Sequence, residues 1–243
     1  MIGTGALVNA AAVPAGGGLG LLIKSALRPR FSDILMKANG LAVLFIGAAG
    51  AMSGLLLVGE DGRLSSGSPL LLICALTLGG LLGEWVRIED RMEQLGNFLQ
   101  KKMGRLGGGR FSEGFVTNTL VICVGAMAVV GAFNDGLLGD PTLLYTKALL
   151  DGVISMVFAG TLGVGVLFAA LPLGIYQGAL TIAARLIAPL VSDALLADLS
   201  LVGSVLVFAI GINLTFGKRI KAGNLLPALL IPPVWHGISA LLG

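Results

Sequence analysis

The segment LPLGIYQG, residues 171–178, interrupts a long apolar run with a proline and two glycines. A proline inside a helix removes one backbone donor and clashes with the preceding turn, so we expect the helix to kink or unwind there. The segment VPAGGGLG, residues 13–20, has the same Pro-x-Gly-x-x-x-Gly spacing 158 positions earlier. We therefore predict broken helices at matching points of two halves of the chain: Pro14, Gly16, Pro172 and Gly174.

The composition is that of an integral membrane protein. Of 243 residues, 56% are hydrophobic and 12% are charged, against about 25% charged in soluble domains. The mean hydropathy is +0.95, and a soluble globule of this size cannot bury so much apolar surface. The expected partner is the lipid bilayer, and no nucleic-acid partner is expected.

The apolar runs are long and continuous rather than alternating, which excludes a β-barrel and predicts an all-α bundle. We expect one transmembrane domain, residues 1–243, with about eight spans. The predicted spans are residues 3–23, 37–58, 68–86, 113–133, 143–162, 164–187, 198–217 and 223–242. Almost no polar linker separates the fifth and sixth spans, so whether both cross fully stays open.

The basic residues predict the orientation. With eight spans, 13 of the 16 lysines and arginines fall on one side of the membrane and three on the other. Since cytoplasmic loops are enriched in these residues, both termini are expected outside the cytoplasm. If the fifth and sixth spans were one crossing, the basic cluster at 218–221 would move to the wrong side.

The long connection after the third span contains an amphipathic pattern. Apolar residues recur at spacings of three and four over residues 85–106, with charged residues between them. This pattern predicts a helix on the cytoplasmic side. The helix either lies in the lipid headgroups or packs against the same helix of another subunit, and the sequence favours neither.

An internal repeat relates spans one to three, about residues 3–86, to spans six to eight, about residues 164–242. The linking spans cover about 113–162. The matches are Ala11, Ala12, Pro14, Gly16, Gly20 and Leu22 with Ala169, Ala170, Pro172, Gly174, Gly178 and Leu180; Ser32 and Asp33 with Ser192 and Asp193; Ile46 and Gly47 with Ile210 and Gly211. Five spans separate corresponding helices, so the 3+3 repeat is inverted. Chance similarity between glycine-rich segments is the alternative.

Polar residues inside apolar spans are costly, and Asp151 is the most informative of them. Lys147, Asp151 and Ser155 are spaced by four, so they share one helix face and Lys147 can pair with Asp151. The carboxylate either binds a cation or proton, or forms a structural ion pair. Other polar residues line a path in the first case and form interhelical hydrogen bonds in the second: Asn9, Asn118, Gln177, Thr181 and Asn213.

Motifs for chemistry are lacking. The sequence has no HExxH, Walker A or GxSxG motif and no Cys/His cluster, so we expect neither enzymatic activity nor a cofactor or metal site. The single histidine, His236, follows Trp235; we expect it to anchor the chain at an interface, and a proton relay is the alternative.

Several short motifs together resemble a known family. They are GEW (83–85), GRFSEGFVT (109–117), CVGAM (123–127), NDG (134–136), GD (139–140), KALLDG (147–152) and YQG (176–178). The chain resembles the YqgA/YdfK-like family of bacterial inner-membrane proteins, which carries a domain of unknown function, number 554. The resemblance implies a multi-pass inner-membrane protein, often described as a transporter, without a known substrate or known functional residues. The motifs of this resemblance also include Asp135 and Asp140. These acids either order the loop before span five or attract cations.

We expect a secondary transporter of a small solute or ion, with its site near Asp151 and Gln177. The alternatives are an ion channel and a non-transporting scaffold or sensor that acts through the amphipathic helix. Glycines at positions 47, 50 and 54 form a small-residue face that suggests a homo-oligomer.

Overall fold

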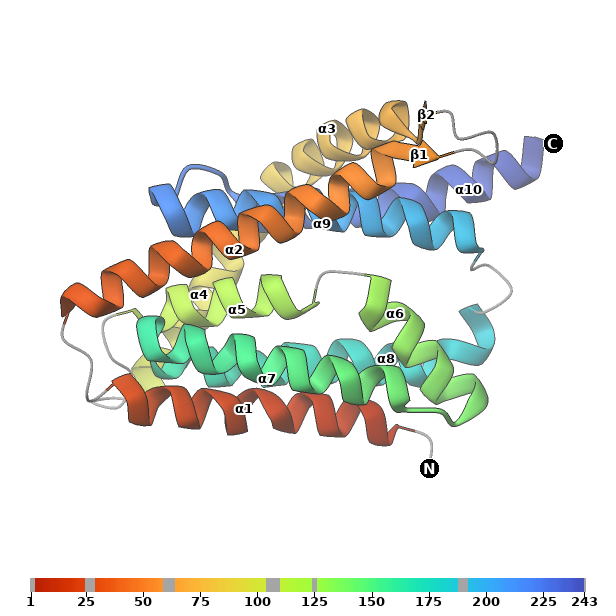
Figure 1. Ribbon diagram of the computed structural model, residues 1–243. Helices are drawn as coiled ribbons and strands as arrows, with labels where there is room; N and C mark the ends of the chain where they lie inside the picture. Colours follow the sequence, from red (N-terminus) through yellow and green to blue (C-terminus); the bar gives the residue numbers. More distant parts are fainter. Residues whose placement is uncertain are drawn as a thin grey trace. The chain divides into compact units, whose positions relative to one another are not determined.

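The computed structural model describes residues 3–24, 29–58, 64–103, 110–123, 126–187 and 192–242. Their regular secondary structure is helical, apart from one short β ribbon (Figure 1). The chain divides into two compact units, and each unit draws elements from distant parts of the sequence. The units do not coincide with the two predicted repeats, and the single-domain organisation stays a prediction.

Unit 1 contains α1, the start of α2, most of α4, and the elements from α5 to α8. The bounds of these elements are α1 Thr4–Lys24, α2 Pro29–Leu55, α4 Ile88–Met103, α5 Phe111–Cys123, α6 Ala126–Phe133, the π-helical turn η2 Asn134–Leu138, α7 Thr142–Leu162, the 3₁₀ helix η3 Val164–Ala169 and α8 Ala170–Ile187. A buried apolar cluster joins Val13 of α1, Ile122 of α5 and Leu173 of α8.

Unit 2 contains the rest of α2 and the last helices of the chain. Its other elements are β1 Leu56–Val58, β2 Leu64–Ser66, α3 Pro69–Val86, α9 Asp193–Phe216, the 3₁₀ helix η5 Ala222–Leu230 and α10 Ile231–Leu242. The two strands pair antiparallel and link α2 to α3, which the expectation of an all-α fold did not include. Leu71, Val202 and Ala228 form the centre of the unit's apolar core.

In unit 1, α1 packs directly on the backbone of α7. A Cβ atom on Gly16 would collide with the carbonyl of Gly152, and one on Gly20 with the carbonyl of Met156. From Gly16 to Gly20 on α1, the contact moves from Gly152 to Met156 on α7. The two helices therefore run parallel and lie side by side (Figure 1). Small residues permit this separation because no side chain stands between the helices.

The predicted break at Pro14 and Gly16 is wrong, because α1 is one continuous helix through both residues. Pro14 removes a single hydrogen bond, and α1 packs on α7 both before this residue, at Gly5, and after it, at Gly20. Gly16 is required for the close approach to Gly152 rather than for a break in the helix.

The predicted break at Pro172 and Gly174 is also wrong, since both lie inside α8. Pro172 is in the first turn of α8, where backbone N–H groups have no partner within the helix, so its missing donor costs little. The interruption comes earlier, at Gly163 (φ 94°, ψ −162°), which ends α7 and leads into the 3₁₀ helix η3. A side chain is strained at this positive φ, so Gly163 allows the tight hairpin between α7 and η3.

In unit 2, the glycines of α2 pack against α9. A Cβ atom on Gly47 would collide with the backbone of Phe208, and one on Gly50 with the side chain of Ser204. The small-residue face at positions 47, 50 and 54 is therefore covered within the chain and gives no argument for a homo-oligomer, which stays a prediction.

The amphipathic helix begins later than predicted. Arg87 adopts a left-handed conformation (φ 55°, ψ 54°) that ends α3 and separates Trp85 from α4. In unit 2, the buried Glu89 fixes this corner by accepting from the N–H of Gly223 at 3.0 Å and pairing with Lys218 at 2.8 Å. The predicted end of the amphipathic helix, residues 104–106, lies outside the described residues.

The described residues contain six helices that are long and apolar enough to cross a membrane, or seven if the bent pair α5–α6 counts as one span. The bend in this pair is 62°. The prediction of eight spans is not reproduced: the last predicted span, 223–242, consists of a 3₁₀ helix of nine residues and an α-helix of 12.

The substitution Gly16→Ala is expected to destabilise the protein by about 1–3 kcal/mol, because the added methyl group overpacks the α1–α7 contact. Gly18 is the matched control: it lies on the same helix, and no atom stands within 4 Å of the position of an added Cβ. Gly18→Ala should be neutral or stabilising by about 0.5–1 kcal/mol. Thermal unfolding in detergent, followed by circular dichroism, measures both changes, and equal midpoints for the two variants would contradict the packing model.

Candidate functional site

The centre of unit 1 holds an ion pair on the inner face of α7. Lys147 and Asp151 are only 6% and 3% exposed. The Lys147 ammonium donates to both carboxylate oxygens of Asp151, at 2.8 and 2.7 Å, and to the carbonyl of Ile122 at 2.8 Å. Ile122 lies in the last turn of α5, where carbonyls lack a partner within the helix and carry the negative end of its dipole. All three ammonium hydrogens are thus used.

Two buried amides connect this pair to α1 and α8. Asn9 of α1 donates from Nδ2 to Oε1 of Gln177 on α8 at 3.0 Å, and both side chains are 0% exposed. The Asn9 side chain also interacts with the Asp151 carboxylate. Asn9, Lys147, Asp151 and Gln177, called the polar cluster below, therefore join three helices.

A second polar contact lies one turn farther along α7. Asn118 of α5 donates to the hydroxyl of Ser155 at 3.0 Å and to the carbonyl of Val166 at 3.1 Å. This amide ties α5 and α7 to the 3₁₀ helix η3, whose backbone hydrogen bonds have poorer geometry than those of an α-helix.

Several buried polar atoms in these two layers have no hydrogen-bond partner among the described residues. They are Oδ1 of Asn9, Nε2 of Gln177, Oγ1 of Thr181, Oδ1 of Asn118 and Oγ1 of Thr119. An unsatisfied buried polar atom costs about 1–3 kcal/mol. Such atoms are satisfied by water, an ion or a polar solute, and the set includes both donors and acceptors.

The structure thus brings together most of the polar residues singled out from the sequence. Asp151, Asn9 and Gln177 meet in the polar cluster, Thr181 lies one helical turn from Gln177, and Ser155 contacts Asn118. Asn213 is different. It lies in unit 2, where its side chain accepts from the N–H groups of Arg219 and Ile220 at 2.8 and 2.9 Å and orders the turn after α9.

Unit 2 contains an ionisable pair that sequence reasoning missed. Nε2 of His236 lies 2.8 Å from Oδ2 of Asp198. The predicted span 198–217 starts at Asp198, whereas α9 begins at Asp193 and places Asp198 inside the helix. Ser192 caps this helix by accepting from the N–H of Leu195, and a serine before an apolar run is a recognisable start signal.

Two acids that precede α7, Asp135 and Asp140, accept from backbone N–H groups at the starts of helices. The buried Asp135 accepts from the N–H groups of Gly3 and Gly5, at 3.1 and 3.0 Å, and so caps α1 from a distant part of the chain. The hydroxyl and N–H of Thr142 donate to Asp140 and hold the pKa of its carboxyl below the usual range. Asp140 therefore stabilises the fold above about pH 4, and this contribution is lost as the pH falls. Within the described residues, no group of three or more His, Cys, Asp or Glu side chains has the arrangement of a metal site.

The ion pair gives a prediction with an internal control. Asp151→Asn leaves Lys147 buried without a counter-charge and should destabilise the protein by about 3–5 kcal/mol. The double replacement Lys147→Met with Asp151→Leu removes both charges at similar volume and should be nearly neutral for stability. Chemical unfolding in detergent compares the wild type with these two variants. A loss in the double variant as large as that in Asp151→Asn would show that the cost does not come from the unpaired charge.

The cap on α1 gives a second prediction. Asp135→Ala removes the acceptor of two backbone N–H groups and should cost about 1–3 kcal/mol of unfolding free energy. Asp140→Ala is the control and should cost less, because water replaces its exposed, local hydrogen bonds. Thermal unfolding compares them, and an equal or larger loss in the control would be inconsistent with the capping role of Asp135.

The fold and this site define a multi-pass α-helical membrane protein with a buried, charge-compensated polar cluster. The chain belongs to the DUF554 family, described as a protein of unknown function, whose model matches residues 4–236.

Two curated bacterial proteins are similar to this chain over nearly their whole length. One is the uncharacterised membrane protein YdfK of Bacillus subtilis, 33% identical over 230 residues that cover 95% of this chain and 94% of YdfK. The other is the uncharacterised protein YqgA of Escherichia coli, 33% identical over 231 residues that cover 93% of each chain. No solved structure matches the chain.

Proposed function

We propose that the protein is a secondary transporter, not an enzyme, and that the polar cluster of unit 1 binds a small polar solute or an ion. The observation that carries the proposal is the buried Lys147–Asp151 pair beside amides with unsatisfied atoms, inside helices that cross a membrane. Ionisable groups at membrane depth are costly, face the interior of a bundle and mark substrate or ion pathways.

The chemistry of the cluster suits reversible binding. Lys147 neutralises Asp151, so the pair carries no net charge and is tolerated in a low-dielectric surrounding. A cation or a proton that reaches Asp151 competes with Lys147 for the carboxylate. Oδ1 of Asn9 and Nε2 of Gln177 then offer one acceptor and one donor to the ligand.

The interrupted helix lies beside this cluster. Transporter sites often form where a helix is discontinuous, because freed backbone groups can bind substrate or ions. The 3₁₀ helix η3 runs from Val164 to Ala169 within a candidate span, and Asn118 already binds one of its carbonyls. We assign the discontinuity to this segment rather than to the two prolines.

Contacts between matched glycines support the inverted repeat. Gly47 of α2 approaches Phe208 of α9, while its sequence counterpart Gly211 of α9 approaches Leu44 of α2. Phe208 lies three positions before Gly211, and Leu44 lies three positions before Gly47. The two contacts are therefore reciprocal, as in a two-fold contact. The helices are antiparallel here, as an axis in the membrane plane requires.

The other repeat partners are also neighbours. Within unit 1, Gly174 of α8 approaches Ala10 of α1, and Gly17 of α1 approaches Leu167 of η3, so α1 and α8 are antiparallel. Within unit 2, α3 contacts α10. In this proposal, the two repeats move relative to each other and expose the cluster alternately to the two sides, with both termini outside the cytoplasm.

The test uses purified protein in lipid vesicles. A thermal-shift panel of ions and small polar metabolites first finds a stabilising ligand, because a ligand that binds the native state raises its stability. Uptake of that ligand should be saturable. It should fall at least tenfold in the double variant Lys147→Met with Asp151→Leu, which keeps the fold, and should persist in Asp140→Asn, which lies outside the cluster.

Each other result has a defined meaning. Flux that rises linearly with concentration and shows no coupling indicates a channel. Normal saturable uptake in the double variant removes the polar cluster from the transport site. Ligand binding without flux under any imposed ion gradient contradicts transport and favours a sensor.

A further inference from the structure

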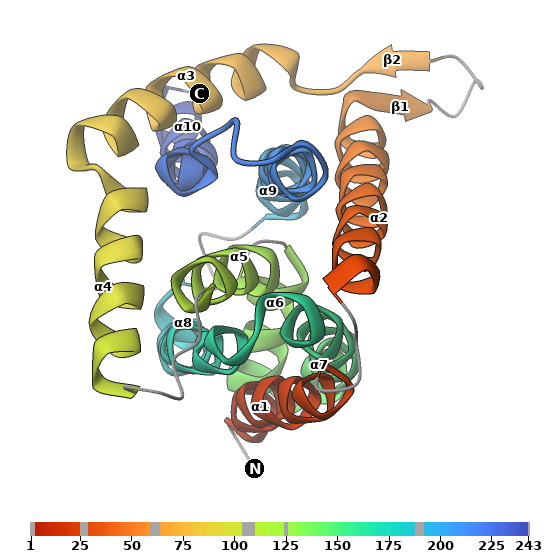
Figure 2. The same cartoon turned by 90° about the vertical axis from the view of Figure 1, so that its left-hand side faces the viewer.

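The helix α4 lies crosswise to the spanning helices of unit 1. Figure 2 views α1, α7 and α8 nearly end-on, whereas α4 extends across the view along its whole length. A helix perpendicular to spanning helices runs in the plane of the membrane rather than through it.

The chain fixes α4 at one end of this bundle. The hydroxyl of Ser112, at the start of α5, donates to the carbonyl of Glu93 at 3.2 Å, and Gly96 packs against Ser112. The start of α5 also contacts Gly165, next to the hairpin turn at Gly163. Residues 93–96 of α4 are therefore held at the end of unit 1 where α7 finishes, which is the depth of a membrane surface.

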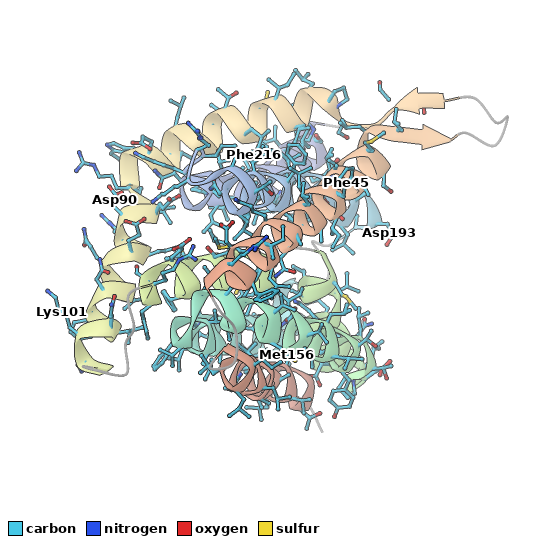
Figure 3. The ribbon with its side chains drawn as sticks, turned by 60° about the vertical axis from the view of Figure 1, so that its left-hand side comes forward. Phe45, Asp90, Lys101, Met156, Asp193 and Phe216 are labelled. Atoms are coloured by element: carbon cyan, nitrogen blue, oxygen red, sulfur yellow. The ribbon has the colours of Figure 1, made fainter. Side chains whose placement is uncertain are left out.

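The opposite face of α4 is exposed and mainly cationic, because the acids Asp90 and Glu93 are less exposed than the cations of this helix. Within the described part of α4, its exposed side chains are three cations, two apolar groups and two amides, with no acid: Arg91, Lys101, Lys102, Leu95, Phe98, Gln94 and Asn97. Leu95 and Phe98 are 50% and 54% exposed. The Lys102 ammonium lies 4.9 Å from the centre of the Phe98 ring, and Lys101 projects outward from the helix (Figure 3).

We infer that this outward face of α4 binds a layer of anionic phospholipid headgroups. The two apolar side chains enter the boundary between headgroups and acyl chains, and the three cations contact the phosphates above them, as is usual for an interfacial helix. The cations on this face argue against a second copy of the chain as its binding partner. A two-fold contact between copies brings this face of one copy against the same face of the other, and none of the fully exposed side chains there is an acid that compensates the cations.

The experiment measures the depth of labels on α4 in the full-length protein. Spin labels are attached at Leu95→Cys, and separately at Asn97→Cys, after Cys74 and Cys123 are replaced by alanine. The proteins are placed in bilayers of phosphatidylcholine alone or with about 30% phosphatidylglycerol, a content at which surface charge is substantial. Collision with oxygen reports burial in lipid, and collision with a water-soluble nickel chelate reports exposure to water.

The label at position 95 should be more accessible to oxygen than to the nickel chelate, and more so in the bilayers that contain phosphatidylglycerol. The label at position 97, on the polar edge, should favour the nickel chelate. The triple variant Arg91→Gln, Lys101→Gln and Lys102→Gln should lose the dependence on phosphatidylglycerol and retain at least threefold less of this lipid on purification. Added salt should weaken the wild-type effect, since exposed charges are screened.

Three results would overturn the inference. Equal access of the nickel chelate to both labels would place the face in water. Dipolar broadening between labels at position 95 of different molecules would identify a second copy as the occupant. Retention of phosphatidylglycerol by the triple variant at the wild-type level would exclude these cations as its binding groups.

Discussion

The close approach of α1 to α7 determines where the polar groups of unit 1 meet. Gly16 and Gly20 let α1 lie directly on the backbone of α7, and no larger residue permits that separation. At this distance Asn9 reaches both the ion pair on α7 and Gln177 on α8. The polar cluster therefore depends on two positions that carry no functional group, and the cap from Asp135 holds the start of the same helix.

The second constraint is the cost of charge and unpaired polar atoms at membrane depth. The charge of Lys147 is fully compensated, because its ammonium donates to Asp151 and to a carbonyl at the end of α5. The amides are only partly hydrogen-bonded, since one atom of Asn9 and one of Gln177 have no partner among the described residues. Under the proposed function, the saturated charge pair holds the polar cluster together and the unsaturated amide atoms are available to a ligand.

Most spans were predictable, because a continuous apolar run in lipid has few alternatives to a helix. The breaks were not. The effect of a proline depends on its position in the helix, and the start of α8 is set by the hairpin at Gly163 rather than by Pro172 itself. The glycines of α2 show the same ambiguity, because a small-residue face looks alike whether it meets α9 or another subunit. Asp198 was missed because its helix begins at Asp193, before the apolar run that predicts the span 198–217.

The sequence by itself determined that this is a multi-pass helical membrane protein and that Lys147, Asp151 and Ser155 share one face, because spacing along a helix fixes direction around it. Only the tertiary structure decided which distant residues join that face. Asn9 and Gln177 are far apart in the chain and meet, whereas Asn213, an equally good candidate by composition, binds its own loop. The physical reason is that a polar residue in an apolar run must find a partner, and its sequence does not specify whether that partner is local or lies across a helix contact.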